Sequence, residues 1–476
     1  MMEEPYSVSF KDDSKNTFKL AICGKNRLIK LAYFITLFLL IVVNSTNAQL
    51  SVSENGRYLA RHDGTPFLWL GDTGWGLFQK LSHKDIDFYF KTRAEQGFSV
   101  VHAAVVHKNP FIVPELENIY GDKAFADETL MLPAVTDGKD NNDQADYDYW
   151  DHVDYVVDKA DKYGLYLVFV PLFNMAEGDG YNLINVENAY GYGKFLGKRY
   201  KDKTNIIWCM GGDVLAENDQ SKTIWNLLAK GITESIAGKE DYSKTLMTYH
   251  VRGGHSSSDY FGNAPWIDFH MIQTWDSYTT IYDMVAKDYN NKLVKPVLHG
   301  EGAYEDGPEY PTKPITSHKI RKQAYWATFA GGMHTYGNTN IWSFGSNLKY
   351  VKQDWKEAIY SDGAKSMSVY HQIFQSLNWW DFSPDQSIIA EGTGTGDSLN
   401  VAMNSVKTNQ ILVYLSEPSE VSLDLNKLSG STKLPGEWIN PKTGERKSAG
   451  KFSKNKDVKV KTPLGWEDAL LLIGDR

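Results

Sequence analysis

The stretch "TNIIWCMGGDV" (204–214) carries an apolar run into two glycines and an aspartate. A second stretch, "KPVLHGEGAYE" (295–305), likewise stops at a glycine, a glutamate and a glycine. A continuous apolar run is typical of a strand buried on both faces, as in a parallel sheet. The glycines let the backbone turn sharply and let a ligand come close to it. Each stretch therefore predicts a buried strand that ends on a carboxylate, Asp213 in the first and Glu301 in the second.

Six further apolar runs have the same character, and amphipathic segments separate them. The eight predicted strands are 67–72, 100–107, 166–174, 206–213, 246–251, 267–274, 296–301 and 332–338. The predicted helices, in which apolar residues return every three or four positions, are 83–97, 148–164, 186–202, 221–238 and 317–332. Eight buried strands that alternate with helices favour a closed barrel. The sequence therefore predicts the α/β fold class, with a (β/α)8 TIM barrel over residues 49–385.

The pattern changes after residue 385. The stretch "SIIAEGTGTGDSLNVAMNSVKTNQILVYLSEPSEVSLDL" (387–425) alternates apolar and polar residues between Gly, Asn, Ser and Pro turns. Short alternating strands with regular turns are typical of an antiparallel β-sandwich. We therefore predict a small β-sandwich domain over residues 386–476.

The N-terminal segment has the composition of a secretory signal. Lys25, Arg27 and Lys30 precede the uncharged run "LAYFITLFLLIVV" (31–43), and the small residue Ala48 follows. The alternative is an uncleaved membrane anchor, but this run is shorter than the roughly 18 residues that span a bilayer. We expect residues 1–48 to be a signal peptide, with a secreted or periplasmic mature protein that has no membrane span.

Composition excludes several classes of partner. The net charge of -9 makes nucleic acid a poor partner. Beyond the signal only Cys209 remains, so no internal disulfide forms, and no Cys/His cluster offers a zinc site. No phosphate-binding glycine loop is present either. We therefore expect no cofactor and no metal, and the oligomeric state is not indicated.

The two strand-end carboxylates suggest a reaction. In a barrel of this kind the chemistry sits at the C-terminal ends of the strands, and Asp213 and Glu301 end the fourth and seventh predicted strands. Two carboxylates that face one pocket are the equipment of glycoside hydrolysis. The alternative is that each carboxylate caps the following helix. We predict a carbohydrate substrate with Asp213 and Glu301 as catalytic residues.

The chain resembles a known family. The run "LSVSENGRYLARHDGTPFLWLGDTGWGLFQKLSHKDIDFYFKTRAEQGFSVV" (50–101), "IIWCMGGDV" and "VLHGEGAYE" are similar to the apiosidase-like glycoside hydrolases, family 140. The C-terminal "GEWINPKTGER" and "PLGWEDALLLI" resemble the β-domain of collagen-binding type that usually follows. The resemblance implies a bacterial (β/α)8 enzyme acting on apiose-containing pectin side chains. It implies Asp213 as general acid/base and Glu301 as nucleophile.

The sequence differs from the broader clan of retaining glycoside hydrolases at the position of the general acid/base. That clan usually carries Asn-Glu at the end of strand four, and this chain has Gly212 and Asp213. Aspartate is one methylene shorter than glutamate, and glycine cannot make the 2-OH contact of the asparagine.

Other polar and aromatic residues lie near the predicted strand ends. We expect Asp72 to contact a sugar hydroxyl, with a turn cap as the alternative, and Trp75 to stack on a sugar face. His102 and His107 differ by an odd number in an alternating strand, so at most one should point into the barrel, and we expect His107. A polar, aromatic rim for substrate is completed by Asn174, Tyr249, His250, Gln273, Trp275, His299 and His334. Of these, His299, Tyr249 and Gln273 are expected to support the ionised Glu301.

Two alternative functions stay open. One is an endo-acting hydrolase of another glycan on the same barrel. The other is a secreted, non-catalytic carbohydrate-binding protein, against which the intact carboxylate pair argues. The acidic chain gives no support to collagen binding, so we expect the C-terminal domain to be a structural partner of the barrel.

Overall fold

The computed structural model describes residues 49–108, 115–143, 145–173, 183–312, 314–345, 348–430, 433–454 and 458–474. The predicted signal peptide, 1–48, lies outside these ranges. No helix within them is long and apolar enough to cross a membrane.

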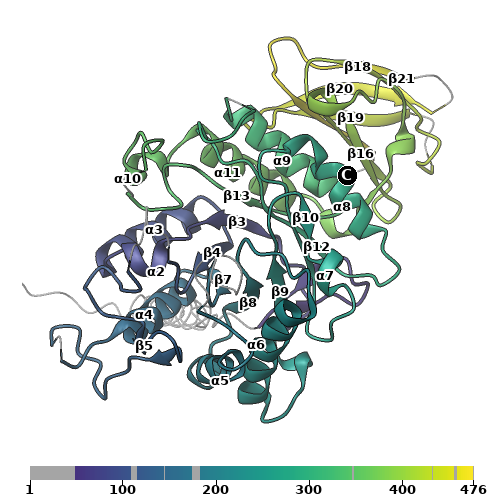
Figure 1. The fold of residues 1–476 in the computed structure, drawn as a ribbon. Coiled ribbons are helices and arrows are strands. Elements are labelled where there is room, and N and C mark those ends of the chain that lie inside the picture. The colour runs from purple at the N-terminus through teal and green to yellow at the C-terminus, as the bar shows by residue number, and fades with distance from the viewer. Residues whose placement is uncertain are drawn as a thin grey trace, which may run out of the picture. The chain divides into compact units, whose positions relative to one another are not determined.

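A parallel barrel forms the larger part of the fold (Figure 1). Within the described residues its eight strands, in chain order, are β3 (Leu70–Thr73), β4 (Val100–Ala104), β7 (Tyr166–Val170), β8 (Ile206–Gly211), β9 (Met247–His250), β11 (His270–Gln273), β12 (Val297–Glu301) and β13 (Met333–Tyr336). The sheet runs β11-β12-β13-β3-β4-β7-β8-β9, and β10 (His255–Ser256) pairs antiparallel with β11. Between β9 and the segment entering β11, the Asp268 amide donates to the Met247 carbonyl at 2.9 Å. The predicted fold class is confirmed.

Helices cover the outside of the barrel. The longer ones are α3 (His83–Glu95), α4 (Tyr149–Lys162), α5 (Ala189–Tyr200), α6 (Asp219–Ala237), α8 (Ile281–Tyr289), α9 (Ser317–Phe329) and α11 (Asp362–Gln375). The single-turn helices are α2 (Leu77–Lys80), α7 (Ser258–Phe261) and α10 (Trp355–Ala358). Local sequence explains several boundaries, because Ser82, Asp148 and Thr316 accept hydrogen bonds from the first turns of α3, α4 and α9.

Two short strand pairs and several 3-10 turns lie outside these elements. The antiparallel pairs are β1 (Ser51–Val52) with β2 (Leu59–Ala60), and β5 (Phe125–Asp127) with β6 (Leu132–Pro133). Short 3-10 turns occur at Tyr242–Lys244, Tyr278–Thr280, Trp379–Asp381, Gln386–Ile388 and Gly396–Ser398.

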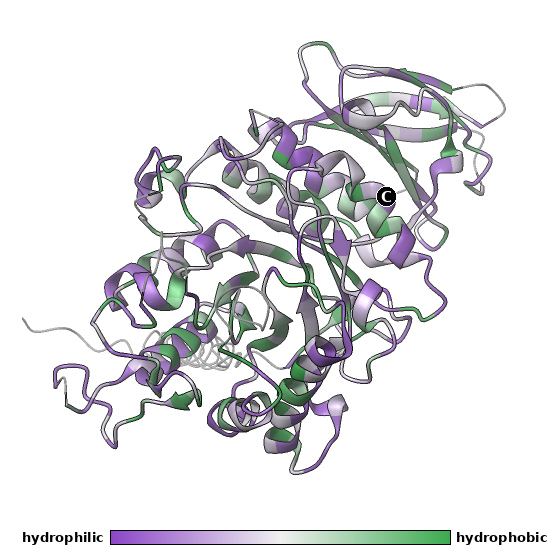
Figure 2. Cartoon of the chain, viewed as in Figure 1, coloured by the Kyte–Doolittle hydropathy of each residue, from purple (hydrophilic) through white to green (hydrophobic). Residues whose placement is uncertain are grey.

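The core follows the predicted burial. Apolar side chains such as Val100, Val168 and Leu298 fill the barrel interior, and a second set, with Leu228 and Ile232, packs between strands and helices. Figure 2 shows the hydrophobic colour along the strands, with mixed colours on the covering helices. Both strand faces are thus buried, which is why the strands appear as continuous apolar runs.

The C-terminal strands form two antiparallel sheets. The larger, in sheet order, is β14 (Ser383–Pro384), β16 (Val401–Ser405), β17 (Gln410–Leu415), β22 (Ala469–Gly474), β19 (Lys433–Ile439) and β20 (Arg446–Ser453). The smaller is β15 (Ile389–Glu391), β18 (Glu420–Leu423) and β21 (Val458–Lys461). An apolar core that includes Ile411, Val421 and Val460 contains side chains from both sheets.

Candidate active site

The end of β8 answers why two glycines precede Asp213. Gly211 and Gly212 have φ angles of 82° and 127°, and Asp213 itself has a φ of 61°. A Cβ on Gly211 would lie 2.4 Å from the His250 carbonyl oxygen, and one on Gly212 would lie 2.8 Å from the Phe173 Cα. Side chains rarely adopt these angles and would collide here, so only glycine fits. The glycines therefore turn the chain so that the Asp213 carboxylate reaches the mouth of the barrel.

A bulge turns Glu301 into the same mouth. Ile272 of β11 pairs with His299, but the next residue, Gln273, pairs with Glu301, so Gly300 is an extra residue in β12. If residues 297–301 formed a regular strand with no bulge, alternation would send Glu301 to the same side as Val297 and His299. Val297 belongs to the core between strands and helices, whereas Glu301 lines a cavity.

The two carboxylates meet around His250. One oxygen of Asp213, one oxygen of Glu301 and one ring nitrogen of His250 all lie within 4.8 Å of one another, close enough that the trio could hold a metal ion. The Asp213 amide donates to Nδ1 of His250 at 3.2 Å. This bond assigns the proton of a neutral His250 to Nε2, which lies 2.9 Å from Glu301 Oε2, although the pair is not aligned as a hydrogen bond.

Tyr304 holds the other oxygen of Glu301. Its hydroxyl donates to Glu301 Oε1 and accepts a hydrogen bond from Trp75 Nε1 at 2.8 Å. Trp75 also packs edge-on against His250, with ring centroids 5.1 Å apart. Oε1 of Glu301 therefore has a fixed hydroxyl donor, and Oε2 lies beside Nε2 of His250.

The environment of Asp213 favours its protonated form. Burial, and next the charge of Glu301, raise the pKa of Asp213 from 3.8 to about 6. The positive charge that His250 carries when protonated, a hydrogen bond from Gln273 and the nearby Arg252 oppose this rise in pKa. Two neighbouring carboxyl groups in different environments can divide the roles of acid and base between them.

The cavity around this pair has a volume of about 290 Å³. The sequence predicted six of its lining residues: Trp75, His107, Asp213, Gln273, Trp275 and Glu301. It missed Phe173, Tyr304, Glu309, Tyr310, Trp342 and Tyr350. Three of the missed residues, Tyr304, Glu309 and Tyr310, follow Glu301 in the same strand-to-helix connection. Their position just after a catalytic strand end could have indicated that they line the cavity.

Comparison with known proteins gives the family. The protein-family model described as "Apiosidase-like, catalytic domain" matches residues 53–381 of this chain. This chain belongs to the apiosidase-like family. A second model, described as "Putative collagen-binding domain of a collagenase", matches residues 383–473. No curated protein matches the chain.

Two similar solved structures are described as glycoside hydrolases. One described as a glycoside hydrolase is 31% identical, covers 90% of this chain and 97% of its own, and has a TM-score of 0.78. A family 5 glycoside hydrolase from Bacteroides vulgatus ATCC 8482 is 29% identical, covers 90% of this chain and 93% of its own, and has a TM-score of 0.78. The apiosidase-like chain is accordingly a glycoside hydrolase.

In this apiosidase-like chain, the His107 ring faces the cavity and makes no hydrogen bond. Neither of its ring nitrogens has a hydrogen-bond partner, and burial lowers its pKa to about 4. The ring lies against Phe173, with centroids 4.8 Å apart. A neutral imidazole with both nitrogens available suits contact with hydroxyl groups.

The prediction that only one of His102 and His107 points inward was wrong. β4 ends at Ala104, so strand alternation does not extend to His107. His102 lies inside the barrel, where Nε2 is 3.0 Å from the Thr335 hydroxyl and the ring packs on Trp75.

Asp72 does not line the cavity, which corrects its expected contact with a sugar. Its side chain is fully buried, and Oδ2 accepts from Arg93 Nε at 2.6 Å and from the Tyr89 hydroxyl. Asp72 thus joins β3 to α3 from within the protein. The turn-cap alternative does not describe this contact either.

Tyr249, His299 and His334 also lie away from the cavity lining, contrary to prediction. The Tyr249 hydroxyl donates to the Val214 carbonyl at 2.9 Å and so supports the segment after Asp213. His299 and His334 face each other, with their Nδ1 atoms 3.0 Å apart, and His299 Nε2 lies 2.9 Å from the Thr274 hydroxyl. The bulge at Gly300 leaves His299 on the side opposite Glu301. Asn174 lies outside the described residues.

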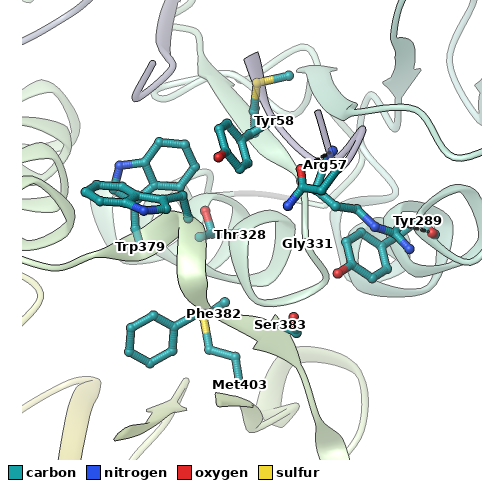
Figure 3. Close-up of a pocket in the computed structure, with 13 residues that line it drawn as sticks. Arg57, Tyr58, Tyr289, Thr328, Gly331, Trp379, Phe382, Ser383 and Met403 are labelled. Carbon is teal, nitrogen blue, oxygen red and sulfur yellow. Dashed lines mark hydrogen bonds between the residues drawn. The ribbon is translucent and has the colours of Figure 1, made fainter. Parts of the chain in front are cut away.

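A second recess lies at the opposite end of the barrel, where β13 begins (Figure 3). It is lined by Arg57, Tyr58, Tyr289, Trp379 and neighbouring residues, and its volume is only about 70 Å³. The Arg57 guanidinium stacks on the Tyr289 ring at 3.8 Å and donates to the Tyr289 carbonyl. This recess is too small for a sugar. The contacts around it hold the β1–β2 hairpin against the end of the barrel opposite the catalytic site.

Proposed function

We propose that this glycoside hydrolase is exported, starts near Gln49 and cleaves apiose-containing pectin side chains with retention of anomeric configuration. The observation that carries the mechanism is the Asp213–Glu301 pair, whose oxygens approach within 4.8 Å. Retaining enzymes hold their two carboxyl groups about 5–5.5 Å apart, whereas inverting enzymes leave room for a water at about 6.5–9.5 Å. The substrate class rests on the apiosidase-like family and the polar, aromatic cavity.

The cavity suits a single sugar residue. Its volume of about 290 Å³ is at the small end of the roughly 300–1,000 Å³ typical of ligand pockets. Trp75 and Trp275 offer apolar faces, and His107 and Gln273 offer hydrogen-bonding groups.

The residues perform two displacements. In the first, a Glu301 oxygen attacks the anomeric carbon while Asp213 gives its proton to the leaving oxygen, so the glycosidic bond breaks and a glycosyl ester forms. Tyr304 holds the Glu301 carboxylate in place. In the second, Asp213 takes a proton from water, the water oxygen attacks the anomeric carbon, and Glu301 is released. The raised pKa of Asp213 suits the first proton transfer.

The experiment is a screen of the mature protein on neutral and acidic pectic oligosaccharides, with proton NMR of the first product. We expect release of a single sugar with retained configuration. Azide should rescue Asp213→Asn to a glycosyl azide of retained configuration, and Glu301→Ala to one of inverted configuration. Glu309→Gln, which alters a third cavity carboxylate, is the matched control and should keep most of the activity.

Two outcomes would overturn the mechanism. The opposite anomer as first product would make one carboxylate a general base. Activity that a chelator abolishes and an added divalent metal restores would mean that Asp213, His250 and Glu301 act as metal ligands.

A further inference from the structure

A third recess opens on the catalytic face of the barrel. Two segments build it, the N-terminus of α3 after β3 and the long connection between β4 and α4. Its volume is about 260 Å³, and its lining is His83, Tyr120, Asp122, Asn141, Asn142 and Tyr147. We call it the His83 recess. Because both segments follow the C-terminal ends of barrel strands, it shares a face with Asp213 and Glu301.

Hydrogen bonds fix the rings of the His83 recess. The Tyr120 hydroxyl accepts from the His83 amide at 2.9 Å, and the Tyr147 hydroxyl lies 2.7 Å from His83 Nε2. The His83 ring stacks on Tyr155, with centroids 3.8 Å apart. Tyr120 nevertheless keeps 42% of its surface exposed. An exposed ring that is already held in place binds a ligand at low entropic cost.

The lining also offers side chains that recognise hydroxyl groups. Asn141 contacts His83 Nδ1 at 3.3 Å through its amide nitrogen, and Asn142 and Asp122 stand beside it. Burial, and next Lys159, lower the pKa of His83, which favours the neutral ring. Among the lining residues that the structure describes, one is a carboxylate and none is Lys or Arg. This chemistry favours a neutral polyhydroxylated ligand over an acidic one.

Gln79 ties the His83 recess to the catalytic cavity. Its Oε1 accepts from the His107 amide at 2.8 Å, and its Nε2 donates to the Glu117 carbonyl at 3.4 Å. His107 lines the catalytic cavity, and Glu117 lies three residues before Tyr120. The same two strand-to-helix connections therefore supply side chains to both places.

We infer that the His83 recess is a distal subsite that binds a neutral sugar residue of a branched or extended substrate while another residue occupies the catalytic cavity. Tyr120 and Tyr147 supply the stacking faces, and Asn141 and Asn142 contact hydroxyl groups. The inference rests on the proposed function for the identity of the substrate, but not for the existence of the subsite.

The test compares large and small ligands. Tyr120→Ala and Asn141→Ala are measured with neutral pectic oligosaccharides and with a small aryl apioside that reaches only the catalytic cavity. We expect Tyr120→Ala to raise KM for the oligosaccharide about tenfold, as the loss of one stacking contact predicts. KM and kcat for the aryl glycoside should not change. Tyr120→Phe should keep most of the affinity, because it retains the ring.

Tyr360→Ala is the matched control, because Tyr360 is a similarly exposed tyrosine, at 50%, between α10 and α11. It should leave both substrates unaffected. Equal effects of Tyr120→Ala on large and small substrates, or none on either, would overturn the subsite. So would a tenfold preference of the recess for uronate oligosaccharides over neutral ones.

Calorimetry separates this inference from the proposed function. Neutral oligosaccharides are titrated into Glu301→Gln protein with and without Tyr120→Ala. Weaker binding in the Tyr120→Ala background supports the subsite even if the wild-type enzyme hydrolyses none of the pectic substrates. Unchanged binding in both Tyr120→Ala and Asn141→Ala overturns the subsite even if hydrolysis occurs as proposed.

Discussion

At the scale of single residues, the protonation of Asp213 sets the pH dependence. As general acid it must carry its proton, and its pKa is about 6. We expect kcat/KM to fall about tenfold per pH unit as pH rises above this value. Gln273 donates a hydrogen bond that lowers this pKa, so Gln273→Met should move the alkaline limb to higher pH. A pH–rate profile checks both statements, and a shift of that limb to lower pH would contradict the second.

Tyr304 should act on turnover rather than on binding. Tyr304→Phe removes the hydroxyl that fixes Glu301 and accepts from Trp75. Because a misplaced reactive group is costly, we expect kcat to fall about 10- to 100-fold with little change in KM. Tyr190→Phe is the control, since Tyr190 makes the same tyrosine–carboxylate bond to Glu234 away from the cavity. Steady-state kinetics of both variants test this prediction. Equal losses of kcat in Tyr304→Phe and Tyr190→Phe would contradict a role of Tyr304 in turnover.

Residue-scale prediction from sequence succeeded where a strand end alone decided the position. Asp213, Trp75 and Trp275 follow strands, Gln273 ends one, and all four line the cavity. It failed where a side chain's direction depended on tertiary structure. The bulge at Gly300 reverses the alternation between His299 and Glu301, and no local pattern shows it. Asp72 likewise finds Arg93 only after α3 packs on the barrel.

At the scale of elements, the turn after β8 is the most constrained segment of the site. Gly212→Ala would place a Cβ 2.8 Å from the Phe173 Cα at a φ of 127°. We expect a stability loss of about 1–3 kcal/mol and a fall in kcat of at least about tenfold, because Asp213 moves with the turn. Gly238→Ala is the control, since its φ is 75° with nothing within 4 Å. It should cost about 1 kcal/mol in urea denaturation and leave kcat unchanged.

The strands and helices were predictable because burial of one or both faces gives a regular pattern of apolar residues in the sequence. All eight predicted strands and all five predicted helices occur, because the strands are buried on both faces and most of the helices on one, while α9 is buried nearly all round. The prediction omitted α8 and α11. In α11 the apolar residues Met367, Tyr370, Ile373 and Phe374 do return at helical spacing, so the signal was present after the last strand. α8 has only nine residues and follows a 3-10 turn, so its apolar residues repeat over too short a stretch to indicate a helix.

At the scale of the whole described chain, α9 joins the barrel to the C-terminal sheets. Tyr325 of α9 stacks on Tyr414 of β17, with centroids 4.4 Å apart, and both lie in one apolar core with residues of β16 and β22. Trp326 donates to the Leu399 carbonyl at 2.9 Å. The sequence could not show these contacts, because Trp326 and Leu399 lie 73 residues apart in the chain and Tyr325 and Tyr414 lie still further apart. These contacts favour a structural role for the C-terminal domain, whatever else it binds.

The buried pair Arg321–Asp468 gives the sharpest test of that role. Arg321 is fully buried, its Nε and Nη2 donate to the two Asp468 oxygens at 2.9 Å, and the Tyr414 hydroxyl donates to Oδ2. Asp468→Asn would remove the buried charge partner of the guanidinium and leave it only the half-exposed Glu467, at a cost of about 3 kcal/mol. Glu467→Gln removes a second partner of Arg321 that is 48% exposed, so it should cost no more than about 1 kcal/mol. Urea denaturation measures both variants, and kcat at 25 °C should stay at the wild-type value because neither residue lines the catalytic cavity. Equal losses of stability would contradict the special role of the buried pair. A loss of kcat in folded Asp468→Asn would instead make the C-terminal domain part of the catalytic unit.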